Sequence, residues 1–496
     1  MCMRKRVLLL IVIVGCSLIS FAAEKAQQID QLLATYHQLG QLNGVVLVAD
    51  HGQIVYEKGF GYANFEWKAP NTPDTKFRIG SVTKPFTAIL IWQQVEAGKI
   101  DLDAPVTKYL PEYRKDTGDK ILVRHLLTHT SGIPTYIGAD IEKWTSPIPR
   151  PQFMRQYCSG DLESIPGAEF GYNNCGYYLL AEILERVTGK TYAELLRERI
   201  TGPLDMRDTG VDDGQTVLAK RAYGYNKNYL TGVKVARFTD IATAFGTGNM
   251  YSTAEDLFKF DRALYTDKIL GPDARRAMFT PVKGPAAAGW FVSTAPQDHP
   301  AAGHTLEQHE GNIFGYFTML VRVPDREALV LVIDNTHLDS FDGIIRDVLS
   351  ILYERPYSMP KPLIADSLAK ILSRDGSAAA TAEFHRLKQT AADEYEWGGL
   401  NSLGSDLLQA GRAEDAIAIF RLAVENAPQS WYAQFNLGED FKAAGNLGSA
   451  DQAYERALQL NPARPFVRMI EAARPPKAQL PAKQEVGVPA KAKTRH

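Results

Sequence analysis

The sequence predicts an α+β domain, in which one sheet is flanked by helices, followed by a separate all-helical domain. Strand-like segments stand in pairs at both ends of the first 357 residues, with helical segments between them. The region 397–464 repeats itself with a period of 34 residues. The chain has 496 residues, 45% hydrophobic and 23% charged, which suffices for two or three domains and excludes disorder over most of its length.

The N-terminus has the composition of a secretory signal peptide. Residues 1–23 begin with the basic segment Arg4–Arg6 and carry no charge after it, and Ser20 and Ala22 are spaced as in a cleavage site. An uncleaved anchor and lipidation at Cys16 are the alternatives. We therefore expect an exported protein, periplasmic or secreted. No later apolar run approaches the ~20 residues of a membrane span, so none is expected in the mature chain.

Two cysteines, Cys158 and Cys175, remain once the signal peptide is removed. An exported protein enters a compartment that permits disulfides, so the two can pair. The sequence does not supply the Cα distance that decides pairing. Of the two interpretations, we expect two buried thiols, with a disulfide as the alternative.

The first half of the α+β domain follows from hydrophobic periodicity and turn residues. Apolar runs before and after a turn at 50–52 indicate a strand pair, and Gly98 has the position of a helix C-terminal glycine. The expected elements are a helix over 26–40, strands over 44–49 and 53–60, and a helix over 81–97.

The second half is read in the same way. One helical face gathers the apolar residues of 176–188 before Gly189, and Ser252–Glu255 is a capping-box pattern that opens another helix. Strands are expected at 316–323 and 327–334, on either side of a Pro-Asp-Arg turn, and a helix at 341–354. Strand pairs at both ends of the domain predict one mixed sheet.

The C-terminal region is a repeat. The 34-residue offset is the tetratricopeptide period, with small residues where helices cross and a proline that closes each unit. A weaker unit precedes the two clear ones, at 376–384. We expect a signal peptide at 1–23, the α+β domain at 24–357, a linker with a degenerate helical repeat at 358–392, repeats at 393–470 and a disordered basic tail at 471–496. The matched pairs are Trp397 and Trp431, Gly404 and Gly438, Gly411 and Gly445, Ala416 and Ala450, Phe420 and Tyr454, Ala423 and Ala457, and Pro428 and Pro462.

Several function classes are disfavoured. The formal net charge is −2, from 55 basic and 57 acidic residues, which argues against a nucleic-acid binder. The sequence has no P-loop, no dinucleotide fingerprint and no G-x-S-x-G elbow. His309 and Glu310 begin like a zincin motif, but Ile313 stands where the second ligand belongs. His125 and His129, in HLLTH, are spaced as a metal pair, yet no third ligand is evident. We expect no metal and no cofactor.

The first motif with chemical potential is Ser81-Val82-Thr83-Lys84, an S-x-x-K sequence at a predicted helix start. Positions i and i+3 share a helix face, so the Lys84 amine can reach the Ser81 hydroxyl. A serine hydroxyl is a weak nucleophile unless a base lies beside it. S-x-x-K alone is also compatible with an ordinary helix start.

Two further motifs follow in the chain. Tyr172-Asn173-Asn174 is a Y-x-N sequence just before an amphipathic helix, where a tyrosine oxygen can move a proton and an asparagine amide can donate to a carbonyl. His309-Glu310-Gly311 is an H-x-G triplet that leads into a strand, and Gly311 permits a close backbone approach. A packed tyrosine, an asparagine turn and a solvated turn are the bland alternatives.

Together the three motifs resemble those of the serine β-lactamase and penicillin-binding-protein superfamily, in its class-C-like, esterase-like branch. Three more segments carry the resemblance: RHLLTHTSGIP (124–134), PLDMRDTG (203–210) and GTGNMYSTAEDLFKF (246–260). It covers about 44–355. It implies a β-lactamase/transpeptidase-like fold with an antiparallel sheet flanked by helices, and acyl transfer through a covalent acyl-serine without a metal.

The resemblance also implies roles for single residues. Ser81 attacks the carbonyl carbon, and Lys84 and Tyr172 share the role of base; which of them holds the proton is not decided by the sequence. Asn174 orients Lys84 and the acyl carbonyl. The backbone N–H groups of Ser81 and Asn312 form the oxyanion hole, where a lost donor generally costs ~10²–10³ in rate.

One departure affects the expected substrate. Members that recognise penicillin usually carry Lys-Thr-Gly where this chain has His309, Glu310 and Gly311. A lysine supplies a fixed charge for the substrate carboxylate, whereas a histidine is mostly neutral near pH 7. We therefore expect an esterase or D-aminopeptidase-like hydrolase of an ester or amide in a small molecule or peptide.

Two alternatives stay open at this point. One is a β-lactamase or D-alanyl-D-alanine carboxypeptidase, and the other is a binding scaffold that senses a ligand with an inactive hydrolase domain. All three motifs are intact, which disfavours the scaffold. In each case the tetratricopeptide repeats are expected to bind a protein partner or a second copy of the chain.

Overall fold

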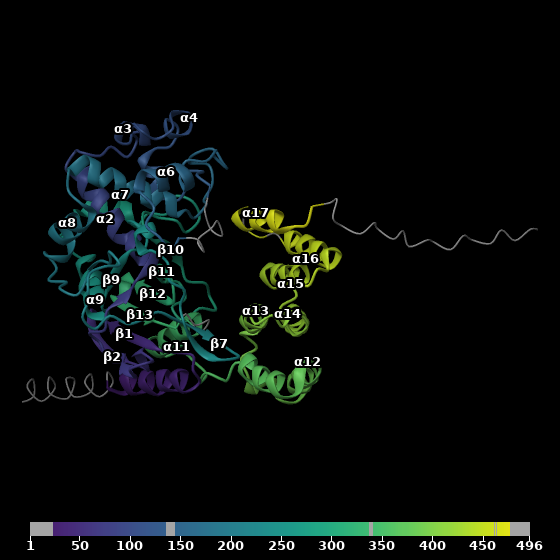
Figure 1. Ribbon diagram of the computed structural model, residues 1–496. Helices are drawn as coiled ribbons and strands as arrows, with labels where there is room; N and C mark the ends of the chain where they lie inside the picture. The colour runs from purple at the N-terminus through teal and green to yellow at the C-terminus, as the bar shows by residue number, and fades with distance from the viewer. Residues whose placement is uncertain (1–22, 135–143, 337–340, 461, 463, 477–496) are drawn as a thin grey trace, which may run out of the picture. The chain divides into compact units, whose positions relative to one another are not determined.

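The chain folds as two compact units, shown in the computed structural model of Figure 1. The structure describes residues 23–134, 144–336, 341–460, 462 and 464–476. The first unit spans residues 1–227 and 231–361, and the second spans residues 228–230 and 362–496. The predicted signal peptide up to residue 22, with Cys16, and the predicted tail beyond residue 476 lie outside the described residues.

The first unit is built on a six-stranded sheet in the order β10-β11-β12-β13-β1-β2. Every neighbouring pair is antiparallel, so the antiparallel sheet is confirmed and the mixed sheet expected from the strand spacing is wrong. The reason is that short connections join four of the five pairs, and β13 returns antiparallel beside β1. The strands are β1 Gly44–Asp50, β2 Gln53–Gly59, β10 Phe291–Thr294, β11 Thr305–Ile313, β12 Tyr316–Val323 and β13 Ala328–Asp334.

The sheet separates two hydrophobic cores, because successive side chains of a strand point to opposite faces. In β1, Val45 and Leu47 pack in one core, with α2 (Thr83–Glu96), α7 (Asn174–Thr188) and α9 (Ala254–Ala263). Val46 and Val48 pack in the other, with the N-terminal helix (residues 23–38) and α11 (Phe341–Leu352). Figure 1 shows these helix layers on the two sides of the sheet. The predicted α+β fold is confirmed.

Short elements complete the first unit. No helix among the described residues is long and apolar enough to cross a membrane. The remaining elements are β3 Tyr62–Asn64, β4 Ala69–Pro70, α3 Val106–Tyr109, α4 Lys115–Gly118, α5 Val123–Leu127, α6 Arg150–Tyr157, α8 Tyr192–Leu196, η3 Arg197–Thr201, β7 Tyr225–Asn228, β8 Gly232–Val235, η4 Ile241–Ala244, α10 Pro272–Met278 and η5 Pro324–Arg326.

A small second sheet brings two distant chain segments together. It has the order β5-β9-β6, with β5 Phe77–Arg78, β9 Met250–Ser252 and β6 Gly210–Val211. The Ile79 N–H extends this pairing by donating to the carbonyl of Met250 at 3.0 Å. The residues just after β5 therefore lie beside the residues just before β9.

The start of α9 differs from the sequence expectation. The capping-box pattern places Ser252 at the N-cap, but the structure places Thr253 there, with its hydroxyl accepting from the Asp256 N–H. The Ser252 hydroxyl instead pairs with the Thr209 hydroxyl at 2.7 Å. Ser252 is the last residue of β9, so its side chain faces a neighbouring segment rather than the helix axis.

The expectation of two buried thiols is wrong, because Cys158 and Cys175 form a disulfide with a Cα–Cα distance of 5.2 Å. Cys158 follows the last residue of α6, and Cys175 lies in the first turn of α7. The two helices bring the Cα atoms within bonding range, which the sequence alone does not reveal. The bond is consistent with export into an oxidising compartment.

Replacing both cysteines by alanine should lower the free energy of unfolding by about 3 kcal/mol, because the bond closes a loop of this size in the unfolded chain. Chemical denaturation of the Cys158→Ala/Cys175→Ala protein measures this. Reduced wild-type protein is the control that keeps both thiols, and its midpoint should fall close to that of the variant. Equal midpoints for oxidised and reduced wild type would contradict the prediction.

The second unit is helical, as the sequence predicts. Its long helix α12 covers most of the predicted linker and is interrupted at Gly376, where φ is 83°. Helix α17 runs three residues beyond the expected end of the repeats. The helices are α12 Ile364–Thr390, α13 Leu400–Gln409, α14 Ala413–Asn426, α15 Trp431–Ala443, α16 Leu447–Gln459 and α17 Arg464–Ala473, with the short η6 Ala392–Glu394.

The glycines of the 34-residue pattern have a packing role. A Cβ atom on Gly404 would lie 2.7 Å from the ring of Phe420, and one on Gly438 would lie 2.7 Å from the ring of Tyr454. Each glycine thus lets the first helix of a hairpin approach the aromatic ring of the second. Because the same contact recurs in α13–α14 and α15–α16, the sequence period corresponds to a repeated helix–helix contact.

Candidate active site

Ser81 and Lys84 lie where a 3₁₀ turn passes into a helix. Ser81 belongs to η1 (Gly80–Val82), and Lys84 is in the first turn of α2. The Lys84 Nζ lies 2.8 Å from the Ser81 Oγ and donates to the carbonyl of Thr247 at 3.0 Å. Thr247 precedes β9, so the pairing of β5 with β9 places its carbonyl beside α2. The sequence did not single out this carbonyl, although it lies within the GTGNMYS segment.

Tyr172 approaches Ser81 from the other direction. Its hydroxyl donates to the Ser81 Oγ at 2.9 Å. The following residue, Asn173, is the N-cap of α7: its side-chain oxygen accepts from the Gly176 N–H at 3.0 Å, and its amide donates to the carbonyl of Ile133 at 2.6 Å. The cap fixes the end of the segment that carries Tyr172. The Ser81 Oγ is thus in contact with both the Lys84 amine and the Tyr172 hydroxyl.

Burial determines the charge states around Ser81. Lys84 is fully buried, and this desolvation holds the pKa of its ammonium well below the usual value, with Glu310 opposing the shift. Burial also raises the pKa of the Tyr172 phenol. A lysine whose pKa is lowered in this way gives up its own proton more readily, so it can act as the base for the serine hydroxyl beside it.

Strand β11 lies directly against the turn that holds Ser81. A Cβ on Gly311 would lie 1.9 Å from the carbonyl oxygen of Ile79, and one on Gly80 would lie 2.8 Å from the amide nitrogen of Asn312. The backbones of β11 and η1 can lie this close because both positions are glycines, which have no Cβ atom. The pairing of β10 with β11 ends at Gln308. Beyond that residue, the same edge of β11 lies against η1 at Gly311 and Asn312.

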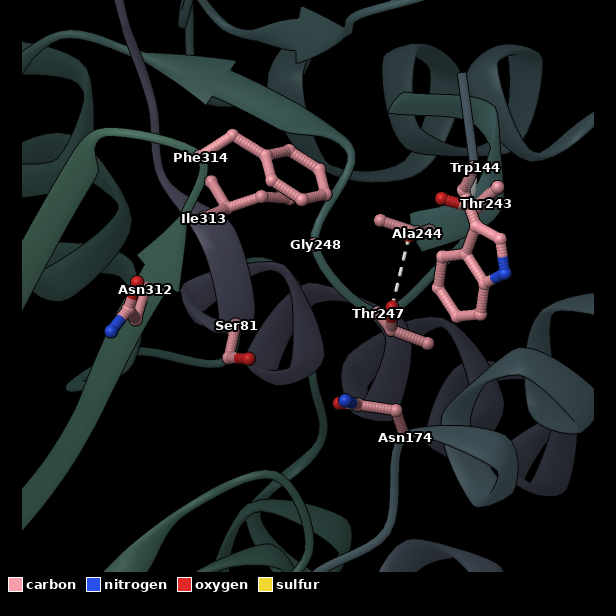
Figure 2. Close-up of a pocket in the computed structure, with 10 residues that line it drawn as sticks. All are labelled: Ser81, Trp144, Asn174, Thr243, Ala244, Thr247, Gly248, Asn312, Ile313 and Phe314. Carbon is pink, nitrogen blue, oxygen red and sulfur yellow. Dashed lines mark hydrogen bonds between the residues drawn. The ribbon is translucent and has the colours of Figure 1, made fainter. Parts of the chain in front are cut away.

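A cavity of about 250 Å³ opens beside Ser81. Figure 2 shows Asn312, Ile313 and Phe314 on one side of Ser81, and Thr247 and Asn174 on the other. Asn174, the first residue of α7, lines the cavity, but the two hydrogen bonds recorded for the Lys84 Nζ go to Ser81 and Thr247. The lining residues are Ser81, Trp144, Asn174, Thr243, Ala244, Thr247, Gly248, Asn312, Ile313 and Phe314.

His309 is buried on β11, and its imidazole is neutral. Burial and the nearby Lys84 lower its pKa to about 3. Its Nδ1 lies 2.6 Å from the carbonyl of Glu310, which can only accept, so the ring proton sits on Nδ1. The Nε2 is buried without a hydrogen-bond partner among the described residues, and the ring lies near those of Tyr172 and Phe291, with centroids 6.5 and 5.5 Å away.

The two histidines of HLLTH are occupied by backbone groups. The Nδ1 of His125 accepts from the Leu122 N–H at 3.1 Å, and the Nδ1 of His129 accepts from the Asn173 N–H at 3.1 Å. Within the part of the chain that the structure describes, no three metal-ligating side chains come together. The imidazoles of this segment therefore serve local structure around the site.

Comparisons with known proteins identify the family of this chain. Residues 27–350 match the family model described as Beta-lactamase. Penicillin-binding protein 4* of Bacillus subtilis (strain 168) is 29% identical over 401 residues, which cover 73% of this chain and 87% of that protein. Teichoic acid D-alanine hydrolase of Staphylococcus aureus is 32% identical over 302 residues, which cover 60% of this chain and 72% of that protein.

The fold is also similar to solved structures. The crystal structure of D-amino acid amidase from Ochrobactrum anthropi SV3, complexed with L-phenylalanine amide, superposes with a TM-score of 0.57 and 26% identity, covering 67% of this chain and 99% of that chain. The family model covers more than half of the sequence, including all three motifs. This chain belongs to the Beta-lactamase family and is a serine hydrolase of the β-lactamase and penicillin-binding-protein type.

Proposed function

We propose that this protein is an exported hydrolase of esters or amides that carry no carboxylate beside the scissile bond, esterase or D-aminopeptidase-like, and that it works through an acyl group on Ser81. The observation that carries the proposal is the Ser81 hydroxyl with Lys84 and Tyr172 at 2.8 and 2.9 Å, beside a neutral His309. Two relatives, named as a teichoic acid D-alanine hydrolase and as a D-amino acid amidase, support this substrate class.

Acylation follows from these contacts. The Ser81 Oγ attacks the substrate carbonyl carbon while its proton passes to the Lys84 Nζ, whose lowered pKa leaves a lone pair available. Tyr172 donates its phenol proton to the oxygen or nitrogen of the leaving group as that bond breaks, and the proton held on the Lys84 Nζ then returns to the phenol oxygen. Its raised pKa keeps the phenol protonated at rest, so it starts as a donor. Water then cleaves the acyl-serine along the reverse proton path.

The developing oxyanion is stabilised by the backbone N–H groups of Ser81 and Asn312. The support is the close approach of η1 and β11, in which a Cβ on Gly311 would lie 3.2 Å from the Ser81 nitrogen. Preorganised N–H donors of this kind stabilise charge that exists only in the transition state. Asn174 acts on the acyl carbonyl from the far wall of the cavity rather than through Lys84.

Substrate preference depends on His309. A fixed positive charge at this position would bind a substrate carboxylate, but the pKa of about 3 leaves this imidazole uncharged at physiological pH. Glu310, beside it, adds a negative charge. A carboxylate next to the scissile bond therefore gains no ionic partner here, and acyl substrates without a carboxylate are preferred.

The His309→Lys/Glu310→Thr protein should shift the ratio of kcat/KM for nitrocefin to that for a short p-nitrophenyl ester upward by about 10- to 100-fold, because a charge-assisted contact contributes ~1.5–3 kcal/mol. Steady-state kinetics on both substrates measure the ratio. His309→Gln, neutral at every pH, is the matched control and should leave it unchanged.

The wild-type comparison tests the proposal itself. It predicts that a neutral p-nitrophenyl ester or a D-amino acid amide is cleaved with a far higher kcat/KM than nitrocefin. If nitrocefin is instead cleaved faster than the ester and the amide, the chain is better described as a β-lactamase. This alternative is kept because one relative is named as a penicillin-binding protein.

We propose tetratricopeptide repeats at 393–470 that bind a protein partner or a second copy of the chain. The recurring glycine–aromatic contact of α13–α14 and α15–α16 supports this assignment. Export is supported by the disulfide and by the composition of residues 1–23.

A further inference from the structure

His129, whose sequence motif the catalytic steps above leave unused, lies beside Tyr172. His129 follows α5 and the C-cap residue Thr128, and its φ is +54°. This left-handed conformation is disfavoured for a non-glycine residue, and helices usually place glycine at such a position. A strained backbone conformation that persists beside a site is a reason to ask what it accomplishes there.

His129 contacts the chain on both sides of Tyr172. Its carbonyl accepts from the Gly171 N–H at 2.8 Å, and its Nδ1 accepts from the Asn173 N–H at 3.1 Å. Its ring also packs against the Tyr172 ring, with centroids 4.5 Å apart. One residue therefore fixes the backbone before and after Tyr172 as well as the face of its ring.

The segment that carries Tyr172 needs this support. Residues 159–173, between the two disulfide cysteines, contain no helix or strand. The Tyr172 hydroxyl must nevertheless stay 2.9 Å from the Ser81 Oγ, and a misplacement of ~1 Å at a reacting group can cost about 10²-fold in rate.

The His129 imidazole is suited to the acceptor role. It is only 3% exposed, and burial, together with the nearby Lys84 and His309 side chains, holds its pKa well below the usual value. The ring stays neutral, its single proton lies on Nε2, and Nδ1 keeps the lone pair that the Asn173 N–H needs.

From this geometry we propose that His129 is a positioning residue for Tyr172: it aligns the phenol with Ser81 through its carbonyl, its Nδ1 and its ring, and touches no substrate atom. The inference rests on the proposed role of Tyr172 as a proton relay and adds a residue on which that relay depends.

The test compares two replacements that both tolerate a positive φ. His129→Asn keeps an acceptor, because its Oδ1 is attached to Cγ as the histidine Nδ1 is, whereas His129→Gly has neither acceptor nor ring. For a p-nitrophenyl ester, His129→Gly should lower kcat by about 10²-fold with little change in KM. His129→Asn should recover most of the loss, and circular dichroism should show both proteins folded.

A double-mutant cycle decides whether the effect runs through Tyr172. In a Tyr172→Phe background the ring remains but the hydroxyl is absent, so His129→Gly should lower kcat by less than about 3-fold. An equal loss in both backgrounds, or a His129→Asn protein as impaired as the His129→Gly protein, would overturn the inference while leaving the role of Tyr172 intact. Full activity of Tyr172→Phe alone would instead overturn the proposed relay, and the inference with it.

Discussion

Ser81→Ala should abolish turnover of every substrate, with kcat lowered on the order of 10⁶-fold, as when a catalytic serine is removed from other hydrolases. The reason is that no other nucleophile replaces its Oγ, which both the Lys84 amine and the Tyr172 hydroxyl contact. The protein should remain folded, because Lys84 keeps its hydrogen bond to the Thr247 carbonyl. Ester hydrolysis and labelling by a fluorophosphonate probe measure the loss.

Non-additivity separates a catalytic unit from independent contributions. Lys84→Ala should be severely impaired on its own, and Ser81→Ala/Lys84→Ala should be little worse than Ser81→Ala, because the base has nothing left to activate. Thermal unfolding of each variant serves as the control for folding. A Ser81→Ala protein that still takes up the probe covalently would contradict the assignment.

Gly311→Ala should lower kcat by about 10²–10³-fold, the usual effect of a lost oxyanion donor. The added methyl would lie 1.9 Å from the Ile79 carbonyl oxygen, so β11 and η1 must move apart. That separation displaces the Asn312 N–H from the Ser81 N–H, which together form the proposed oxyanion hole. The KM of a small ester should change less than kcat, since the cavity wall at Asn174 and Thr247 does not belong to β11.

Gly398→Ala is the matched control for this prediction. At Gly398 an added Cβ would lie 3.4 Å from the nearest side-chain atom, an ordinary contact, and the position lies in the second unit. This variant should retain wild-type kcat. A Gly311→Ala protein with unchanged kcat would show that the close approach of β11 is not needed for the reaction.

The fold was predictable where local patterns decide it. The apolar residues of 44–49 and 328–334 pack alternately into the two cores on opposite faces of the sheet, as strand periodicity requires. Two details were not predictable. Cys158 and Cys175 pair because α6 and α7 meet in space, and the α9 cap shifts to Thr253 because Ser252 faces Thr209. Both outcomes depend on tertiary contacts between segments separated in the sequence.

The site was predictable to the extent that it follows from short motifs. S-x-x-K on a helix start places Lys84 against Ser81 by geometry alone, and the structure adds Tyr172 at 2.9 Å. The Thr247 carbonyl was missed, since every residue has a carbonyl and only the β5–β9 pairing brings this one to Lys84. His129 looked like half of a metal site; its use as an acceptor depends on a backbone N–H 44 residues later.

The central claim is a covalent acyl group on Ser81, and mass spectrometry of the protein quenched during turnover of a slowly hydrolysed ester tests it most directly. The account predicts an intact mass raised by one acyl group, with the addition mapped to the peptide that contains Ser81. The adduct should disappear when the substrate is exhausted. Two results would contradict the account. One is turnover with no acyl adduct detected on either the wild-type or the Tyr172→Phe protein, and the other is an adduct mapped to a residue other than Ser81.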